Sequence, residues 1–211
     1  MLNIHARETI SRVLTPLGTR LARAGVTPNV ITVIGTVGTV ASAVYFYPRG
    51  QWFVGSACIT VFVLLDMVDG AVARAGNTVT AFGGVLDSSC DRIADAAIFG
   101  GLLWYFAQHG QKWLLLAALL CLILGALTSY IRARAEAAGL NATVGIAERA
   151  ERLIIVLVGT GLTGPPFHVP YLQPISLWLL VAASTITVGQ RFAAVYRQAR
   201  DQATDPASTG A

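Results

Sequence analysis

The stretch from Asp66 to Asp91, DMVDGAVARAGNTVTAFGGVLDSSCD, decides how this chain of 211 residues folds. It places four carboxylates in or beside segments that are otherwise apolar enough to cross a bilayer: Asp66, Asp69, Asp87 and Asp91. An ionised carboxylate at the centre of a bilayer costs about 2.5 kcal/mol or more. Four such groups in two neighbouring segments therefore need a compensating partner, and we expect that partner to be a metal ion.

The composition excludes an ordinary soluble domain. Hydrophobic residues make up 55% of the chain and charged residues 12%, whereas soluble domains contain about 25% charged residues. The apolar residues gather into runs close to the roughly 17 to 25 residues that a membrane-spanning helix needs. Six such runs cover 28 to 47, 51 to 73, 85 to 107, 113 to 131, 152 to 169 and 171 to 190. We therefore expect an all-α membrane protein with six transmembrane helices.

The basic residues indicate the orientation of these helices. If the N-terminus is cytoplasmic, 13 of the 15 Lys and Arg residues fall on that side, and Arg49 and Lys112 fall on the other. Short cytoplasmic loops of membrane proteins carry such an excess of positive charge. We expect a multi-pass protein of the cell membrane with both termini cytoplasmic and the acidic stretch at the cytoplasmic face.

The chain reads as one domain, with a transmembrane bundle over residues 26–200 flanked by two different termini. In residues 1–25, apolar side chains recur at spacings of three and four among four arginines. This pattern predicts an amphipathic helix that lies flat in the membrane interface; a helix packed on the bundle is the alternative. Residues 201–211 are polar and include Pro206 and Gly210, so we expect a disordered tail.

The acidic stretch has the spacing of a ligand cluster. Asp66 and Asp69 are three residues apart, and Asp87 and Asp91 are four apart, so each pair shares one face of a helix. An antiparallel pair of helices would bring all four together. Oxygen ligands without a nearby His or Cys favour a hard divalent cation such as Mg²⁺.

Two residues in the same stretch suit a phosphate ligand beside the metal. Gly70 removes a side chain directly after Asp69, which lets a ligand approach the helix closely. Arg74, four residues further on, carries a fixed positive charge with a planar fork of donors. The stretch therefore predicts a combined metal and phosphate site.

Two other interpretations of the acids remain open from the residues alone. A network of structural salt bridges is one, although Arg74 and Arg92 can neutralise only two of the acids. A divalent-cation transporter is the other, and it would need acids that continue towards the far side of the membrane. In this chain the run of acids ends at Asp95.

The spacing of the stretch resembles the signature of the CDP-alcohol phosphotransferase family. The matching positions are Asp66, Asp69, Gly70, Ala73, Arg74, Gly83, Asp87 and Asp91. The resemblance implies a membrane enzyme with six spans that transfers a phosphatidyl or related group from a CDP-linked donor to an alcohol and releases CMP. It also implies a homodimer, and nothing in it indicates a nucleic-acid partner.

The resemblance assigns roles to these residues. Two Mg²⁺ ions, with Mn²⁺ as the alternative, would be held by Asp66, Asp69, Asp87 and Asp91. Asp91 would also be the general base. The CDP part of the donor would contact Asn29, Val30, Ile31, Thr32, Gly70, Arg74 and Thr80. Reasoning from residue chemistry agrees on the acids and Arg74 but does not by itself find Thr80 or residues 29 to 32.

The alcohol acceptor is indicated by a cluster of arginines around residues 129 to 153. These arginines could be topology determinants, or they could form an anion pocket for a phosphorylated acceptor. The segments SYIRARAEAAG and GIAERAERLII are similar to the phosphatidylinositol phosphate synthases of actinobacteria. That similarity implies CDP-diacylglycerol as donor and inositol 3-phosphate as acceptor. By position, the candidate phosphate ligands are Arg132, Arg152 and Arg191, with Arg134 and Arg149 as weaker ones.

Glycerol 3-phosphate is the alternative acceptor. A phosphatidylglycerophosphate synthase of the same family would share every metal ligand and differ only in the acceptor pocket. Where actinobacterial relatives often have Lys, this chain has Arg132, which keeps the charge but changes its geometry.

Overall fold

The computed structural model describes residues 27–75 and 80–204, with the backbone alone for 67–71, 74–75 and 203–204. The predicted amphipathic helix in residues 1–25 lies outside this part of the chain. Within the described ranges every regular element is helical and no strand is present, which confirms the all-α class.

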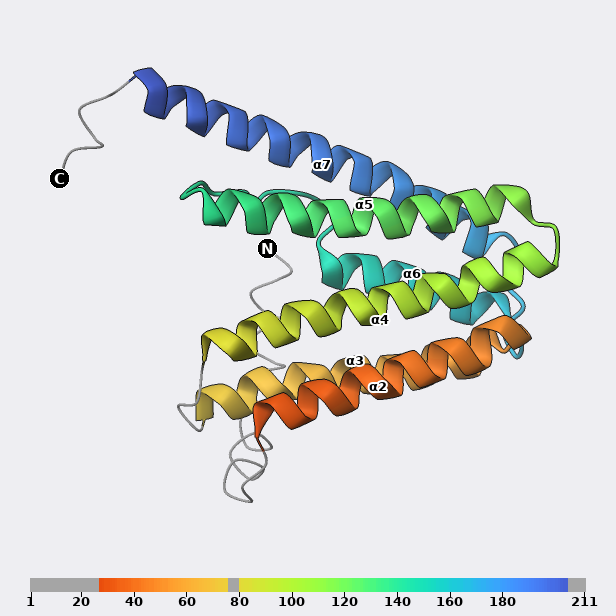
Figure 1. Cartoon of the computed structure of the whole chain (residues 1–211). Coiled ribbons are helices and arrows are strands. Elements are labelled where there is room, and N and C mark those ends of the chain that lie inside the picture. Colours follow the sequence, from red (N-terminus) through yellow and green to blue (C-terminus); the bar gives the residue numbers. More distant parts are fainter. Residues whose placement is uncertain (1–26, 76–79, 205–211) are drawn as a thin grey trace. The chain divides into compact units, whose positions relative to one another are not determined.

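All six apolar runs form helices in the part of the chain that the structure describes (Figure 1). The elements are α2 (Pro28–Phe46), the 3-10 turn η1 (Tyr47–Arg49), α3 (Trp52–Ala75), α4 (Ala81–Gln108), α5 (Lys112–Ala137), α6 (Arg149–Thr163) and α7 (Leu172–Thr204). Most of the expected boundaries hold to within a few residues.

Three helix ends differ most from the expectation. Helix α5, expected to end at residue 131, continues to Ala137. The helix expected to reach residue 169 ends at Thr163, because Gly164 is extended and the Pro165-Pro166 pair cannot continue a helix. Helix α7 continues to Thr204, into the segment expected to be a disordered tail from residue 201. The run from Phe192 to Thr204 contains neither Gly nor Pro, so nothing in it terminates the helix.

Among the described residues, three helices are long and apolar enough to cross a membrane by length and composition: Pro28–Arg49, Lys112–Ala137 and Leu172–Gln202. Helices α4 and α6 do not meet these two requirements. Helix α4 has 28 residues but carries four charged side chains between Asp87 and Asp95. Helix α6 has only 15 residues. The chain is thus a membrane protein with at least three strongly apolar helices.

The contacts divide the chain into two compact units, Met1–Gly101 and Leu102–Ala211. The single domain expected from the sequence stays a prediction. The boundary falls inside α4. The first unit holds the acidic stretch, and the second holds the arginine cluster.

In the first unit, α2 and α3 lie side by side, and glycines let them approach closely (Figure 1). A Cβ atom added to Gly35 would lie 3.2 Å from the carbonyl oxygen of Phe62 and 3.3 Å from the Cβ of Asp66. A side chain on Gly38 would collide with the ring of Phe62. The backbone of α2 therefore packs directly against the part of α3 that carries Asp66.

The opposite end of this helix pair is closed by a buried tyrosine. The hydroxyl of Tyr47 lies 2.9 Å from the hydroxyl of Ser56, which satisfies both groups in the core. Gly50 takes the left-handed conformation, with φ at 68°, that the turn into α3 requires. A Cβ on Gly101 of α4 would lie 2.7 Å from the carbonyl oxygen of Ala43, so α4 also packs closely on α2 here.

In the second unit, α7 packs against both α5 and α6. The thiol of Cys121 on α5 donates to the carbonyl oxygen of Leu177 on α7 at 3.4 Å. The backbone N–H of Gln173 donates to the hydroxyl of Thr163 at 3.1 Å, which ties the start of α7 to the end of α6. These contacts give polar groups between the helices hydrogen-bond partners within the protein in place of water.

We expect Gly101→Ala to lower the melting temperature of the detergent-solubilised protein. Its methyl group must move the backbone of α2, because the obstacle is a carbonyl oxygen rather than a flexible side chain; such overpacking costs about 1 to 3 kcal/mol. The matched control is Gly100→Ala, where a Cβ meets no atom within 4 Å. Equal melting temperatures for the two variants would contradict this packing.

Candidate active site

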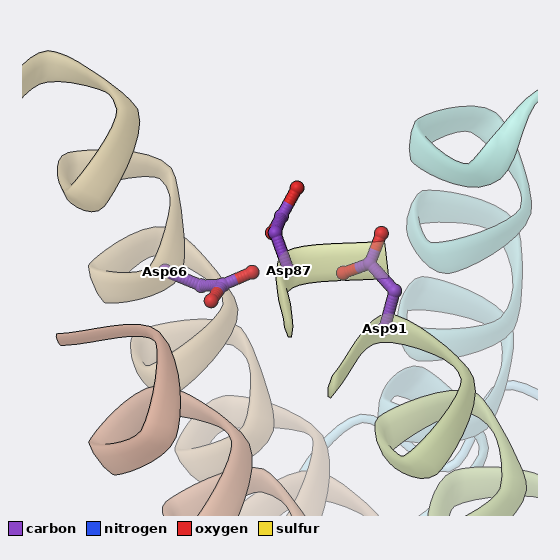
Figure 2. A group of neighbouring side chains, drawn as sticks. All are labelled: Asp66, Asp87 and Asp91. Atoms are coloured by element: carbon purple, nitrogen blue, oxygen red, sulfur yellow. The ribbon is translucent and has the colours of Figure 1, made fainter. Parts of the chain in front are cut away.

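Three carboxylates meet within the first unit. Asp66 on α3 and Asp87 and Asp91 on α4 each offer an oxygen, and these oxygens all lie within 4.8 Å of one another (Figure 2). Asp87 is exposed, and Asp66 and Asp91 are partly buried, so a solute can reach the group. The structure thus brings together three of the four acids expected at the site. The side chain of Asp69 lies outside the described part of the chain.

Local structure explains why these side chains converge. Asp87 and Asp91 are one helical turn apart, so they project from the same face of α4. The start of α4 is set by Thr80, whose hydroxyl accepts a hydrogen bond from the N–H of Gly83 at 3.0 Å. This is an N-cap contact, which stabilises the first turn of a helix. Asp66 is placed by the close contact of α3 with Gly35 of α2.

The donor set fits a divalent cation. Octahedral Mg²⁺ with oxygens at about 2.1 Å holds neighbouring ligand atoms about 3 to 4 Å apart. Oxygens within 4.8 Å of one another reach that spacing through small side-chain rotations. Arg92 lies 3.9 Å from a carboxylate oxygen of Asp91 and only 3.3 Å from Asp95, so its charge is directed mainly to Asp95. Gathered in this way, the three carboxylates form a negatively charged group that a cation would offset.

The residues expected to contact CDP divide into two groups. Asn29 at the start of α2 and Thr80 before α4 meet at Gly83, where an added Cβ would lie 3.4 Å from the Asn29 side-chain oxygen and 3.1 Å from the Thr80 hydroxyl. Ile31 and Thr32 are buried in α2, and Val30 is exposed. For Gly70 and Arg74 the structure describes the backbone alone.

Two arginines of the second unit converge on one residue of α5. Arg152 on α6 donates from Nη1 to the hydroxyl of Thr128 at 3.2 Å and to the carbonyl oxygen of Ala147 at 3.4 Å. Arg191 on α7 donates from Nη1 to the carbonyl oxygen of Thr128 at 2.5 Å and from Nε to that of Val144 at 2.9 Å. Both arginines are only 4% exposed. Two buried positive charges thus lie close together.

The other arginines of the cluster are more exposed. Arg132 lies one turn beyond Thr128 on α5 and donates from Nε to Glu136 at 2.9 Å. Arg191 interacts electrostatically with three charged side chains, those of Glu148, Arg132 and Glu136. Arg134 is exposed and Arg149 is partly buried. Of the five predicted arginines, Arg152 and Arg191 are linked through Thr128, and Arg132 lies one turn beyond Thr128 on α5.

Sequence reasoning missed the residues that hold these groups in place. Gly35 was not singled out, although small residues within an apolar helix often mark a close helix contact. Thr128 was also missed. A hydroxyl in the middle of an apolar run is a weak signal, because such groups commonly bond to their own helix.

The chain is similar to known proteins along most of its length. A family described as CDP-alcohol phosphatidyltransferase matches residues 25–189. The chain is 48% identical over 193 residues to the phosphatidylinositol phosphate synthase of Mycobacterium marinum, covering 90% of this chain and 82% of the relative. It is 44% identical over 207 residues to the enzyme of the same name from Streptomyces avermitilis, covering 95% of this chain and 85% of the relative.

Solved structures give the same result. The phosphatidylinositol phosphate synthase of Mycobacterium tuberculosis with CDP-DAG bound matches with a TM-score of 0.83 and 47% identity, over 88% of this chain and 94% of that one. The structure of that enzyme in complex with manganese and citrate matches with the same TM-score and identity, over 87% of this chain and 88% of that one. The chain belongs to the CDP-alcohol phosphatidyltransferase family.

Proposed function

We propose that this protein transfers the phosphatidyl group of CDP-diacylglycerol to inositol 3-phosphate, giving phosphatidylinositol phosphate and CMP. The observation that carries the proposal is the similarity, over 88% of this chain, to the phosphatidylinositol phosphate synthase of Mycobacterium tuberculosis, whose structure holds CDP-DAG. The gathered carboxylates of Asp66, Asp87 and Asp91 support it independently, since transfer of a phosphatidyl group needs cations beside the phosphates.

Two Mg²⁺ ions are the proposed cofactor, with Mn²⁺ able to replace them. Their ligands are Asp66, Asp69, Asp87 and Asp91; the proposal is supported by the distances among three of these and by the manganese in the related structure. When bound, such ions offset the charge of a pyrophosphate and stabilise the departing phosphate. Through such ions, the carboxylates would hold the pyrophosphate of the donor, which contains the reacting phosphorus.

Asp91 is proposed as the general base. The acceptor hydroxyl forms a new O–P bond at the phosphatidyl phosphorus, its proton passes to Asp91, and the bond from that phosphorus to the bridging oxygen of CMP breaks. We propose direct transfer without a covalent enzyme intermediate. Ser88 and Ser89, between the two carboxylates of α4, donate to the helix carbonyls of Gly84 and Val85, each at 2.8 Å, rather than to a base.

The donor is proposed to bind at the starts of α2 and α4. Asn29 and Thr80 already meet at Gly83, which supports a shared surface for the CDP group. The complete proposed set is Asn29, Val30, Ile31, Thr32, Gly70, Arg74 and Thr80. Because Gly83 carries no side chain, a flat ring can approach the backbone there.

The phosphate of the acceptor is proposed to bind Arg132, Arg152 and Arg191, with smaller contributions from Arg134 and Arg149. A buried guanidinium is costly unless it meets an anion or a full set of acceptors. Two such groups linked through Thr128 form a site that a phosphate dianion would complete. The same pocket could bind glycerol 3-phosphate, and similarity to the relatives favours inositol 3-phosphate.

The proposed setting is the cell membrane, with six spans, an interfacial N-terminal helix, cytoplasmic termini and a homodimeric assembly. Three apolar helices support a membrane location, and α4 adds a rod of about 42 Å at 1.5 Å per residue, which exceeds the bilayer core. The arginine bias supports the cytoplasmic orientation of the site.

We expect the purified protein with Mg²⁺ to release CMP from CDP-diacylglycerol when inositol 3-phosphate is added, and not with free inositol or glycerol 3-phosphate. A chelator should abolish the release, because the carboxylates alone cannot hold the pyrophosphate. Product analysis by mass spectrometry checks the transferred group. Release with glycerol 3-phosphate instead would overturn the acceptor while keeping the metal site.

Arg152→Gln is expected to raise the KM for inositol 3-phosphate by about tenfold or more, since a charge-assisted hydrogen bond to phosphate is lost. The KM for CDP-diacylglycerol should change by less than about twofold. The control is Arg134→Gln. Arg134 is exposed and is assigned a weaker role, so this substitution should raise the KM for inositol 3-phosphate less. An effect confined to the donor KM would contradict the acceptor pocket.

A further inference from the structure

Thr128 is the residue on which the two buried arginines of the second unit depend. It is only 1% exposed, and it lies on the face of α5 that meets α6 and α7. Its hydroxyl donates to the carbonyl oxygen of Gly125 at 2.9 Å and accepts from Nη1 of Arg152 at 3.2 Å. Its own carbonyl oxygen accepts from Nη1 of Arg191 at 2.5 Å. One residue thus binds side chains from two other helices.

These contacts fix the direction of the two guanidinium groups. A guanidinium has five N–H donors in one plane, so a bond from one nitrogen orients the others. Arg152 lies against Gly125, where an added Cβ would be 3.4 Å from Nε and 3.6 Å from Nη2. Nε and Nη2 of Arg152 therefore lie beside α5 while its Nη1 bonds to Thr128 of the same helix.

The loop before α6 supports the same arrangement from the other side. The hydroxyl of Thr187 on α7 accepts hydrogen bonds from the N–H groups of Ile146 and Ala147, at 3.2 and 3.1 Å. Gly145, with φ at 139°, lies so close to Thr187 that no side chain would fit. The carbonyl oxygens of Val144 and Ala147, which accept from Arg191 and Arg152, are thereby held in place.

We propose that Thr128 is a positioning residue for the phosphorylated acceptor, and that its hydroxyl orients Arg152 so that the guanidinium faces the acceptor phosphate together with Arg191. This inference rests on the proposed role of Arg152 and Arg191 as phosphate ligands. Thr128 itself is buried and acts only through the arginines. Its loss therefore affects binding of the acceptor and leaves the donor and the carboxylate cluster unchanged.

The test is Thr128→Val, which has nearly the same shape, lacks the hydroxyl and keeps the backbone carbonyl that binds Arg191. The KM for inositol 3-phosphate should rise about three- to tenfold, the usual effect of losing one hydrogen bond. The donor KM and kcat should stay within about twofold of the values for the unsubstituted protein. Thr128→Ser restores a hydroxyl and should restore the acceptor KM.

A matched control is Thr160→Val on α6. Thr160 is fully buried, and its hydroxyl has no hydrogen-bond partner among the residues that the structure describes. Removing that hydroxyl should change neither KM. If Thr128→Val fails to fold, as judged by thermal unfolding, Thr128→Ala gives the same readout without a branched side chain.

A double mutant separates this inference from the proposed function. In an Arg152→Gln background, Thr128→Val should add nothing to the acceptor KM, because the residue acts through Arg152. An unchanged acceptor KM for Arg152→Gln alone would overturn the arginine pocket itself. A raised KM for Arg152→Gln with no effect of Thr128→Val, or an equal added effect in both backgrounds, would overturn the positioning role alone.

Discussion

Carboxylate oxygens of α3 and α4 lie within 4.8 Å of one another in an otherwise apolar chain, and the proposed chemistry depends on this arrangement. Like charges at this distance repel strongly wherever water is scarce. A bound cation would offset the repulsion, so the same groups that repel one another in the empty site would give it affinity for metal. Gly35, by letting α2 approach α3 at Asp66, contributes to the geometry without any polar atom.

The second unit contains the opposite charge. Arg152 and Arg191 are buried, and carbonyl and hydroxyl oxygens accept hydrogen bonds from them. In the proposed reaction, carboxylates would hold the cations that a pyrophosphate needs, and arginines would supply fixed positive charge with directional donors for the phosphate of the acceptor. The three carboxylates lie on α3 and α4, and the two buried arginines lie on α6 and α7.

The apolar runs were sufficient to predict the helices, because long runs of this kind are compatible with few other structures. The sequence also identified Asp66, Asp87 and Asp91, because charged side chains are costly within such runs. It could not find Thr128, whose role depends on contacts with residues 24 and 63 positions away. Non-local contacts of this kind are not contained in a pattern along the chain. The stop of α6 at Thr163 is different, because its cause, Gly164 followed by two prolines, is local.

The central claim is that Asp66, Asp87 and Asp91 hold divalent metal. The most direct measurement is an anomalous difference map from crystals soaked in Mn²⁺, with Asp87→Asn crystals as the control. The account predicts anomalous peaks within about 2.1 to 2.4 Å of carboxylate oxygens of these three residues, and loss of at least one peak in the variant. Mn²⁺ bound only elsewhere, or equal peaks in both crystals, would contradict it.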